Sequence, residues 1–175
     1  MKEVVWVCGP SAVGKETLIR KLVTESEPVL AQRLGWQGKR ILVSEISLID
    51  IGRGDDDPIL AEREKILDEV PIHLKNADIV LIKWQEVDSG ADRPMRLKRL
   101  LPNEKHRALF LDADFDELCE REVHKWWWNQ EDSPREYRAK ELKLVAKYLD
   151  DLRNDFNITV IDSSKGRDYK ILPTA

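Results

Sequence analysis

The residues with the clearest chemical potential lie near the start of the chain, in Gly9-Pro10-Ser11-Ala12-Val13-Gly14-Lys15. Glycine backbones let successive N–H groups curve around phosphate oxygens, and a helix that begins directly after them adds positive potential. The Lys15 ammonium can then reach the outer phosphates. The apolar run Val4–Cys8 precedes the loop and the amphipathic run Thr17–Val23 follows it. We therefore expect Gly9–Lys15 to bind the phosphates of a nucleoside triphosphate.

The residue after Lys15 departs from the usual pattern of such a loop. A Ser or Thr hydroxyl there helps to hold Mg²⁺, whereas this chain has Glu16 followed by Thr17. A carboxylate so close to the phosphates repels them unless it points away or meets the metal. Direct binding of the metal at this position therefore stays an open question.

The segment Gly9–Leu18 resembles the P-loop of the nucleotide-kinase group. Guanylate kinases are similar at Gly9-Pro10-Ser11 and at Thr17-Leu18. In adenylate kinases the hydroxyl residue is also the second residue after the lysine, as Thr17 is here. The resemblance implies ATP and Mg²⁺ as cofactors. It makes Thr17 the hydroxyl that reaches an α-phosphate oxygen and a candidate metal ligand. The cofactor-binding residues that it implies in this segment are Gly9, Ser11, Ala12, Val13, Gly14, Lys15, Glu16 and Thr17.

Two cations further along the chain resemble the basic pair of the same kinases. Arg121 and Lys125 follow the apolar run Ala108–Leu111 and lie four residues apart on one helical face. In such kinases the first cation stacks on adenine, both contact phosphates, and a lid follows. The resemblance therefore implies cofactor binding by Arg121 and Lys125 and a lid at about 122–138.

The lid region contains further candidate cations. Arg135 and Arg138 lie in the first turns of a predicted helix, Pro134–Phe156. A loose phosphoryl-transfer transition state carries charge on the phosphoryl oxygens, so cations placed beside them stabilise it. The alternative is that both arginines are solvated helix charges. After the fifth apolar run, Ser163 lies in a loop that resembles the adenine-contacting loop. The candidate catalytic residues are Lys15, Arg121 and Arg138.

The acceptor side gives weaker signals. After the apolar run Ile79–Ile82, the nearest carboxylates are Glu86 and Asp88, and neither has the position expected for an acid that orients Mg²⁺. Glu45 and Asp50 are candidates for holding an acceptor hydroxyl. The sequence therefore leaves the general base unassigned.

The segment Arg93–Arg107 is rich in cations and contains few carboxylates. It is a candidate for binding a phosphate on the acceptor, or a nucleic-acid backbone. An exposed helix face is the alternative. The cations are Arg93, Arg96, Lys98, Arg99, Lys105 and Arg107.

Positioning these residues requires alternating strands and helices. The apolar, β-branched runs indicate strands buried on both faces of a parallel sheet. A helix is expected over Ile59–Val70, ended by Pro71, and the predicted helix Pro134–Phe156 has Ser133 as its N-cap. The predicted strands are Val4–Cys8, Ile41–Val43, Ile79–Ile82, Ala108–Leu111 and Ile158–Ile161. With the resemblance, this predicts one α/β domain over 1–175: a three-layer P-loop fold whose five-stranded parallel sheet has the order 2-3-1-4-5, with a helical lid.

The composition narrows the class of protein. The 175 residues are 42% hydrophobic and 35% charged, which is typical of a globular domain. A net charge of −4 argues against a protein that coats nucleic acid with its whole surface. We expect no secretory leader, because Met1-Lys2-Glu3 leads straight into a predicted strand, and no apolar run approaches the roughly 20 residues of a membrane span. We expect a cytoplasmic protein that does not enter membranes, with Cys8 and Cys119 reduced.

The leading hypothesis is an ATP-dependent phosphotransferase that acts on a nucleotide, a nucleoside or another small-molecule acceptor. A polynucleotide 5′-hydroxyl kinase is the first alternative, in which the segment Arg93–Arg107 lines an open channel. A non-catalytic nucleotide sensor or ATPase is the second. Glu16 and the missing acid after the third strand favour that second alternative.

Overall fold

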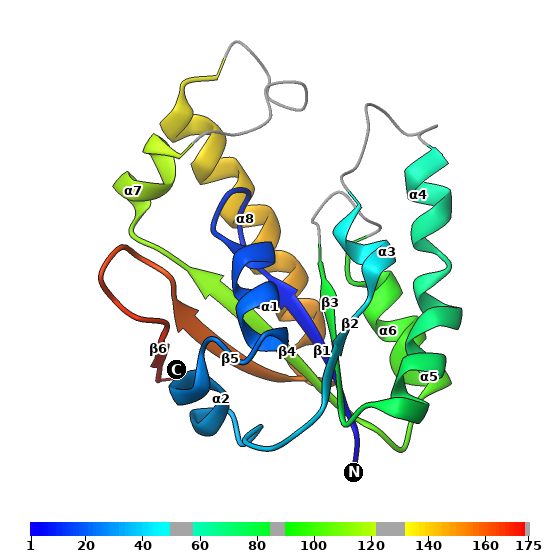
Figure 1. The fold of residues 1–175 in the computed structure, drawn as a ribbon. Coiled ribbons are helices and arrows are strands. Elements are labelled where there is room, and N and C mark those ends of the chain that lie inside the picture. Colours follow the sequence, from blue (N-terminus) through cyan, green and yellow to red (C-terminus); the bar gives the residue numbers. More distant parts are fainter. Residues whose placement is uncertain (50–57, 85–89, 122–131, 174–175) are drawn as a thin grey trace.

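Six strands form one sheet in the order β2-β3-β1-β4-β5-β6 (Figure 1). The computed structural model describes residues 1–49, 58–84, 90–121 and 132–173. Strands β1 to β5 pair in parallel, and β6 pairs antiparallel with β5. The predicted order 2-3-1-4-5 is therefore confirmed, and β6 is an edge strand that was not predicted. The strands are β1 (Glu3–Cys8), β2 (Ile41–Val43), β3 (Ile79–Lys83), β4 (Lys105–Asp112), β5 (Asn157–Asp162) and β6 (Lys170–Leu172).

Helices cover both faces of the sheet and make a three-layer structure. The residues of β1 are all buried, and alternate ones point to opposite faces. Val5 and Val7 pack with α1 and α2, whereas Val4 and Trp6 pack with α5, α6 and α8. Figure 1 shows α1 in front of the sheet and α8 behind it. The helices are α1 (Lys15–Val23), α2 (Pro28–Arg33), α3 (Glu45–Leu48), α4 (Pro58–Arg63), α5 (Ile66–Asn76), α6 (Asp92–Leu100), α7 (Phe115–Glu120) and α8 (Pro134–Leu152).

The predicted helix Ile59–Val70 is wrong in both its continuity and its end. Two helices, α4 and α5, occupy this region, and Pro71 lies inside α5. Proline removes one backbone hydrogen bond. The helix nevertheless continues because Ile66, Val70 and Leu74 form a buried stripe on both sides of the proline, and their packing offsets the lost bond.

The start of α8 agrees with the prediction, whereas its end does not. Ser133 is the N-cap, and its hydroxyl and the Glu136 carboxylate form a reciprocal capping box. The helix ends at Leu152 rather than at Phe156, although Phe156 is buried. Of the predicted lid, 122–131 lies outside the described residues, and 134–138 forms the first turns of α8.

The carboxyl ends of the parallel strands meet at one edge of the sheet, where ligands bind in open α/β folds. Gly9–Lys15 follows β1 there, Lys83 ends β3, and Ser163 follows β5. The fold thus brings segments from distant parts of the chain to the same edge. In the described parts of the chain, no helix has the length and apolar character to cross a membrane.

Candidate nucleotide-binding site

The loop between β1 and α1 depends on glycine at its first position. Gly9 has φ +142°, and a Cβ built there would lie 2.4 Å from the Leu111 carbonyl oxygen of β4. Gly14 is the N-cap of α1 with φ +100°, and a Cβ there would meet nothing within 4 Å. Both positions need the left-handed conformations that glycine adopts easily. At Gly9 the close approach of β4 excludes a side chain as well.

The Lys15 ammonium lies over its own loop. The side chain is 7% exposed, and Nζ donates to the carbonyl oxygens of Gly9 at 2.7 Å and Pro10 at 2.9 Å. The cation is therefore already inside the loop that the sequence predicts to hold phosphate. A phosphate oxygen can replace these carbonyls as the acceptor without a large movement of the lysine.

A buried ion pair from α8 holds the other side of the loop. Arg138 Nη1 donates to Glu141 Oε2 at 2.7 Å, and the two side chains are 1% and 6% exposed. The same Nη1 donates to the Ser11 carbonyl oxygen at 2.8 Å, and the Ser11 N–H donates to Glu141 Oε1 at 2.6 Å. Arg138 Nε also donates to the Leu118 carbonyl oxygen at 2.8 Å. The pair therefore fixes the backbone of Ser11 through both its N–H and its carbonyl group.

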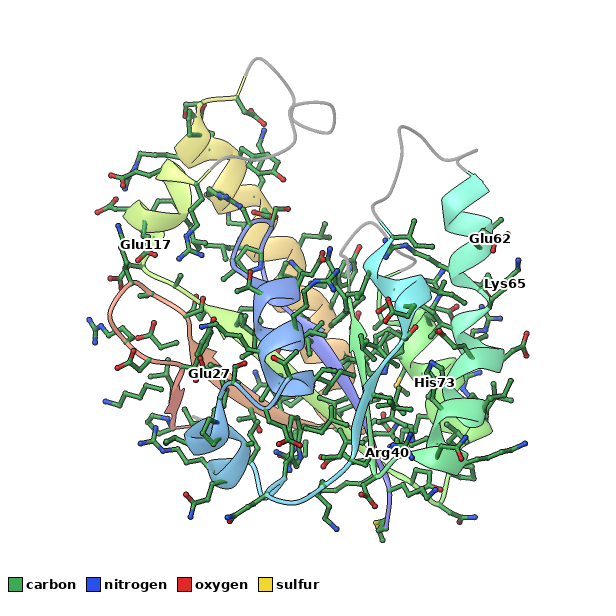
Figure 2. All side chains as sticks on the ribbon, viewed as in Figure 1. Glu27, Arg40, Glu62, Lys65, His73 and Glu117 are labelled. Carbon is green, nitrogen blue, oxygen red and sulfur yellow. The ribbon has the colours of Figure 1, made fainter. Side chains whose placement is uncertain are left out.

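Arg121 and Ser163 also reach the loop. Arg121 Nη1 donates to the Ala12 carbonyl oxygen at 3.1 Å, and its Nη2 donates to Glu117, which Figure 2 labels on α7. The Ser163 hydroxyl lies 3.1 Å from the Val13 carbonyl oxygen. Hydrogen bonds from the Lys165 N–H and from Arg121 lower the pKa of Glu117. These contacts bring Lys15, Arg121, Arg138 and Ser163 to one loop.

Glu16, at the position where the usual pattern has a metal-binding hydroxyl, contacts two cations. Glu16 Oε1 accepts from Arg20 Nε and Nη2 at 3.0 and 2.7 Å, and Glu16 Oε2 accepts from Lys83 Nζ at 3.3 Å. The hydrogen bonds from Arg20 lower the pKa of Glu16; burial opposes this effect, and the charge of Lys83 adds to it. Because both carboxylate oxygens face cations, these residues do not fit a magnesium ion bound at Glu16.

Other metal candidates give no stronger site. Thr17 is exposed on α1. Glu86 and Asp88 lie outside the described residues. Among the residues that the structure describes, no group of three or more His, Cys, Asp and Glu side chains is arranged to hold a metal ion.

Other predicted residues lie outside the described residues or on other elements. Lys125 and Asp50 lie outside the described residues, and Glu45 is exposed at the start of α3. Arg135 Nη1 pairs with Asp116 at 2.5 Å, and the guanidinium lies 4.8 Å from the ring centre of Phe115. These contacts join α8 to α7, so Arg135 links the two helices in this structure.

The cations of Arg93–Arg107 do not form one exposed basic surface. Arg93 is buried and pairs with Glu64 at 3.0 Å, and Arg107 is buried and pairs with Glu3 at 2.8 Å. Arg96 and Lys98 pair with carboxylates of other segments. The possible nucleic-acid partner therefore gains no support from this segment.

Two residues of the site were missed by the sequence analysis. Glu141 lies three residues after Arg138, a spacing that brings both to one helix face, so the pair had a detectable signal. Lys83 directly follows the predicted third strand, where an acid that orients Mg²⁺ was expected. Its charge is positive, whereas the charge of such an acid is negative. Its partner Glu16 is 67 positions away in sequence, and no local pattern joins them.

Comparison with solved structures identifies the fold. A thymidylate kinase from Candida albicans has a TM-score of 0.52 at 13% identity over 99% of this chain and 96% of that chain. A chain of the PezAT toxin-antitoxin system from Streptococcus pneumoniae has a TM-score of 0.54 at 13% identity over 99% of this chain and 72% of that chain. A shikimate kinase from Bacteroides thetaiotaomicron has a TM-score of 0.49 at 12% identity over 91% and 86%.

Sequence comparison gives no such match, since no protein-family model and no curated protein sequence matches the chain. The agreement with the first two structures extends over 99% of the chain. At this level of identity the comparison establishes the fold alone. The chain has the same fold as this thymidylate kinase and this PezAT chain.

Proposed function

We propose that this chain binds a nucleoside triphosphate, ATP in the simplest case, at Gly9–Lys15 and transfers its terminal phosphoryl group to a small-molecule or nucleotide acceptor. The observation that carries the proposal is the position of Lys15, which is buried and held over a loop that packs too closely on β4 for any residue but glycine at Gly9. A lysine placed in this way neutralises charge on the outer phosphates.

The remaining cations have distinct roles in this proposal. Arg121 contacts the loop at Ala12 and is partly exposed, so it can turn toward a phosphate or an adenine ring. Arg138 is buried against the backbone of Ser11 and acts in this conformation as a positioning residue. A direct catalytic contact by Arg138 requires that α8 release these carbonyls when the site closes. No step is assigned to Mg²⁺, because the residues at Glu16 do not fit it.

Two other activities are compatible with the same loop. A nucleotide sensor or ATPase is favoured by the contacts of Glu16 with two cations, which differ from ordinary metal handling. A polynucleotide 5′-hydroxyl kinase is less favoured, because Arg93 and Arg107 are buried and paired. The phosphotransferase remains the proposal because cations from three segments gather at one loop.

The test is phosphoryl transfer from γ-labelled ATP. The full chain is incubated with pooled nucleosides, nucleotides, small alcohols and 5′-hydroxyl oligonucleotides, and labelled products are separated. We expect transfer to a nucleoside, a nucleotide or another small molecule. Lys15→Met is the matched control and should lose both ATP binding and transfer. ATP binding without transfer above the Lys15→Met background would favour the sensor, and labelling of oligonucleotides alone would favour the polynucleotide kinase.

A further inference from the structure

Lys83 has a backbone that the sheet fixes next to the strand leading into the P-loop. It is paired with Val7 in the parallel ladder between β1 and β3, two residues before Gly9. Its N–H donates to the Ser47 hydroxyl at 2.9 Å, and the next N–H, of Trp84, donates to the Val7 carbonyl oxygen at 2.9 Å. The starting point of the lysine side chain is therefore well defined.

The other end of the Lys83 side chain is fixed by Glu16. Nζ lies 3.3 Å from Glu16 Oε2, on the first turn of α1 and directly after Lys15 in sequence. The Lys83 side chain is 12% exposed and that of Glu16 is 36% exposed, so Lys83 is mostly buried and Glu16 is the partner that faces solvent. The ammonium is thus held at the rim of the loop that the proposed function assigns to phosphate.

The charges around Glu16 favour an anion over a metal ion. Arg20 and Lys83 both contact this one carboxylate, so two cations face one anion among these three side chains. Lys15 adds a second positive charge in the adjacent loop. A divalent cation brought to this place meets repulsion from Arg20 and Lys83, whereas a phosphate oxygen meets attraction. Lysine is an effective phosphate ligand because it acts as a compact point charge with three donors.

We propose that the Lys83 ammonium, positioned by Glu16, contacts the bound phosphates in the place of a divalent cation, so that nucleoside triphosphate binds to this P-loop without requiring Mg²⁺. This inference rests on the proposed function in one respect, that Gly9–Lys15 holds the phosphates. It makes Glu16 a positioning residue for a cation, which accounts for a carboxylate beside a phosphate site.

The test is the affinity of the full chain for ATP, measured by titration calorimetry in EDTA and again in excess MgCl₂. We expect the two dissociation constants to agree within about threefold. Lys83→Met should weaken binding in EDTA about 10- to 100-fold, the range of a lost charge-assisted hydrogen bond. Lys83→Arg should retain most of the affinity. Arg153→Met is the matched control, because it removes an exposed cation that pairs with Asp150 at the C-terminal end of α8, away from the loop, and it should change the affinity by less than about threefold.

Failure of this inference is distinguishable from failure of the proposed function. If wild-type protein binds ATP only with Mg²⁺ and Lys15→Met does not bind, the P-loop assignment stands and the role of Lys83 is overturned. If Lys15→Met binds as well as wild type in both buffers, the proposed function itself fails. Thermal unfolding of each variant is recorded in parallel. The comparison of EDTA with MgCl₂ on wild-type protein decides the question even if Lys83→Met does not fold.

Discussion

Two ion pairs flank the P-loop, and they differ in what they hold. Arg138 and Glu141 of α8 are almost fully buried, 2.7 Å apart, and contact the backbone of Ser11 on both its polar groups. Glu16 and Lys83 are 3.3 Å apart at the rim, and their contact joins a side chain of α1 to a side chain of β3. The first pair is part of the scaffold of the loop, whereas the second is accessible to a ligand.

The difference shows how burial separates structure from binding. A buried pair has lost its water, so removing one partner leaves a charge that nothing compensates. The Glu16 carboxylate is 36% exposed, so solvent screens the rim pair and the loss of the Glu16 charge costs less stability. Charge changes at the two pairs should therefore alter different measured quantities.

The largest effect on stability should come from the buried pair. Glu141→Gln keeps an acceptor for the Ser11 N–H but leaves Arg138 buried without its counter-charge. We expect a loss of about 3–5 kcal/mol in the free energy of unfolding. Glu16→Gln is the matched change at the rim and should cost less than about 1 kcal/mol. Urea unfolding of both variants measures the two losses, and equal losses would contradict the distinction.

The contact of the loop with β4 gives the next largest effect. Gly9→Ala places a Cβ against the Leu111 carbonyl oxygen, so we expect a loss of about 3 kcal/mol together with loss of ATP binding. Gly14→Ala adds only backbone strain, of about 1 kcal/mol, because its Cβ meets open space. The same unfolding curves compare them. A mild effect at Gly9 would mean that α8 alone fixes the loop.

Replacing both members of the rim pair with oxygen ligands should make ATP binding depend on Mg²⁺. Glu16→Ser combined with Lys83→Asp supplies a hydroxyl and an acid, both of which are oxygen ligands suited to Mg²⁺. We expect ATP binding of the double variant to be about tenfold or more tighter in MgCl₂ than in EDTA, with little change in thermal stability. If the double variant bound ATP more tightly in EDTA than in MgCl₂, the result would contradict the proposal that Lys83 takes the place of a divalent cation.

The smallest effect involves His106, which lies on β4 outside both pairs. Burial lowers the pKa of His106 below its ordinary value of 6.5. The folded state therefore binds fewer protons than the unfolded state, so stability is full above about pH 6.5 and falls as the pH drops below it. His106→Gln should reduce the drop in Tm between pH 7.5 and 5.5.

The same pH range should leave the rim pair intact. Arg20 lowers the pKa of Glu16 from its ordinary value of 4.5, so this carboxylate remains charged at pH 5.5. ATP affinity in EDTA should therefore not fall through Glu16 in this range. Calorimetry with Glu16→Gln at both pH values checks this expectation, because a pH effect that disappears in the variant would contradict it.

The sequence predicted the strands and the helix start that depend on residues close together in the chain. The apolar runs predicted the five parallel strands, and Ser133 before Pro134 predicted the start of α8. The predicted helix end at Pro71 was wrong, because the buried residues on both sides of the proline stabilise α5 more than the lost hydrogen bond destabilises it. β6 was missed because Lys170–Leu172 contains only two apolar residues, whereas the equally short β2 is wholly apolar. The rim pair could not be predicted from the sequence, because Glu16 and Lys83 come into contact only after β1 and β3 have paired.

The central position of β1 also affects how the chain folds while it is being synthesised. β1 is synthesised before both of its neighbours, which begin at Ile79 and at Lys105. Until β4 is made, one edge of an apolar strand offers unpaired N–H and C=O groups to any other chain. Gly9 packs against the Leu111 carbonyl oxygen only at that stage. Nascent chains therefore carry the loop before β4 can shape it, and during that time aggregation competes with folding.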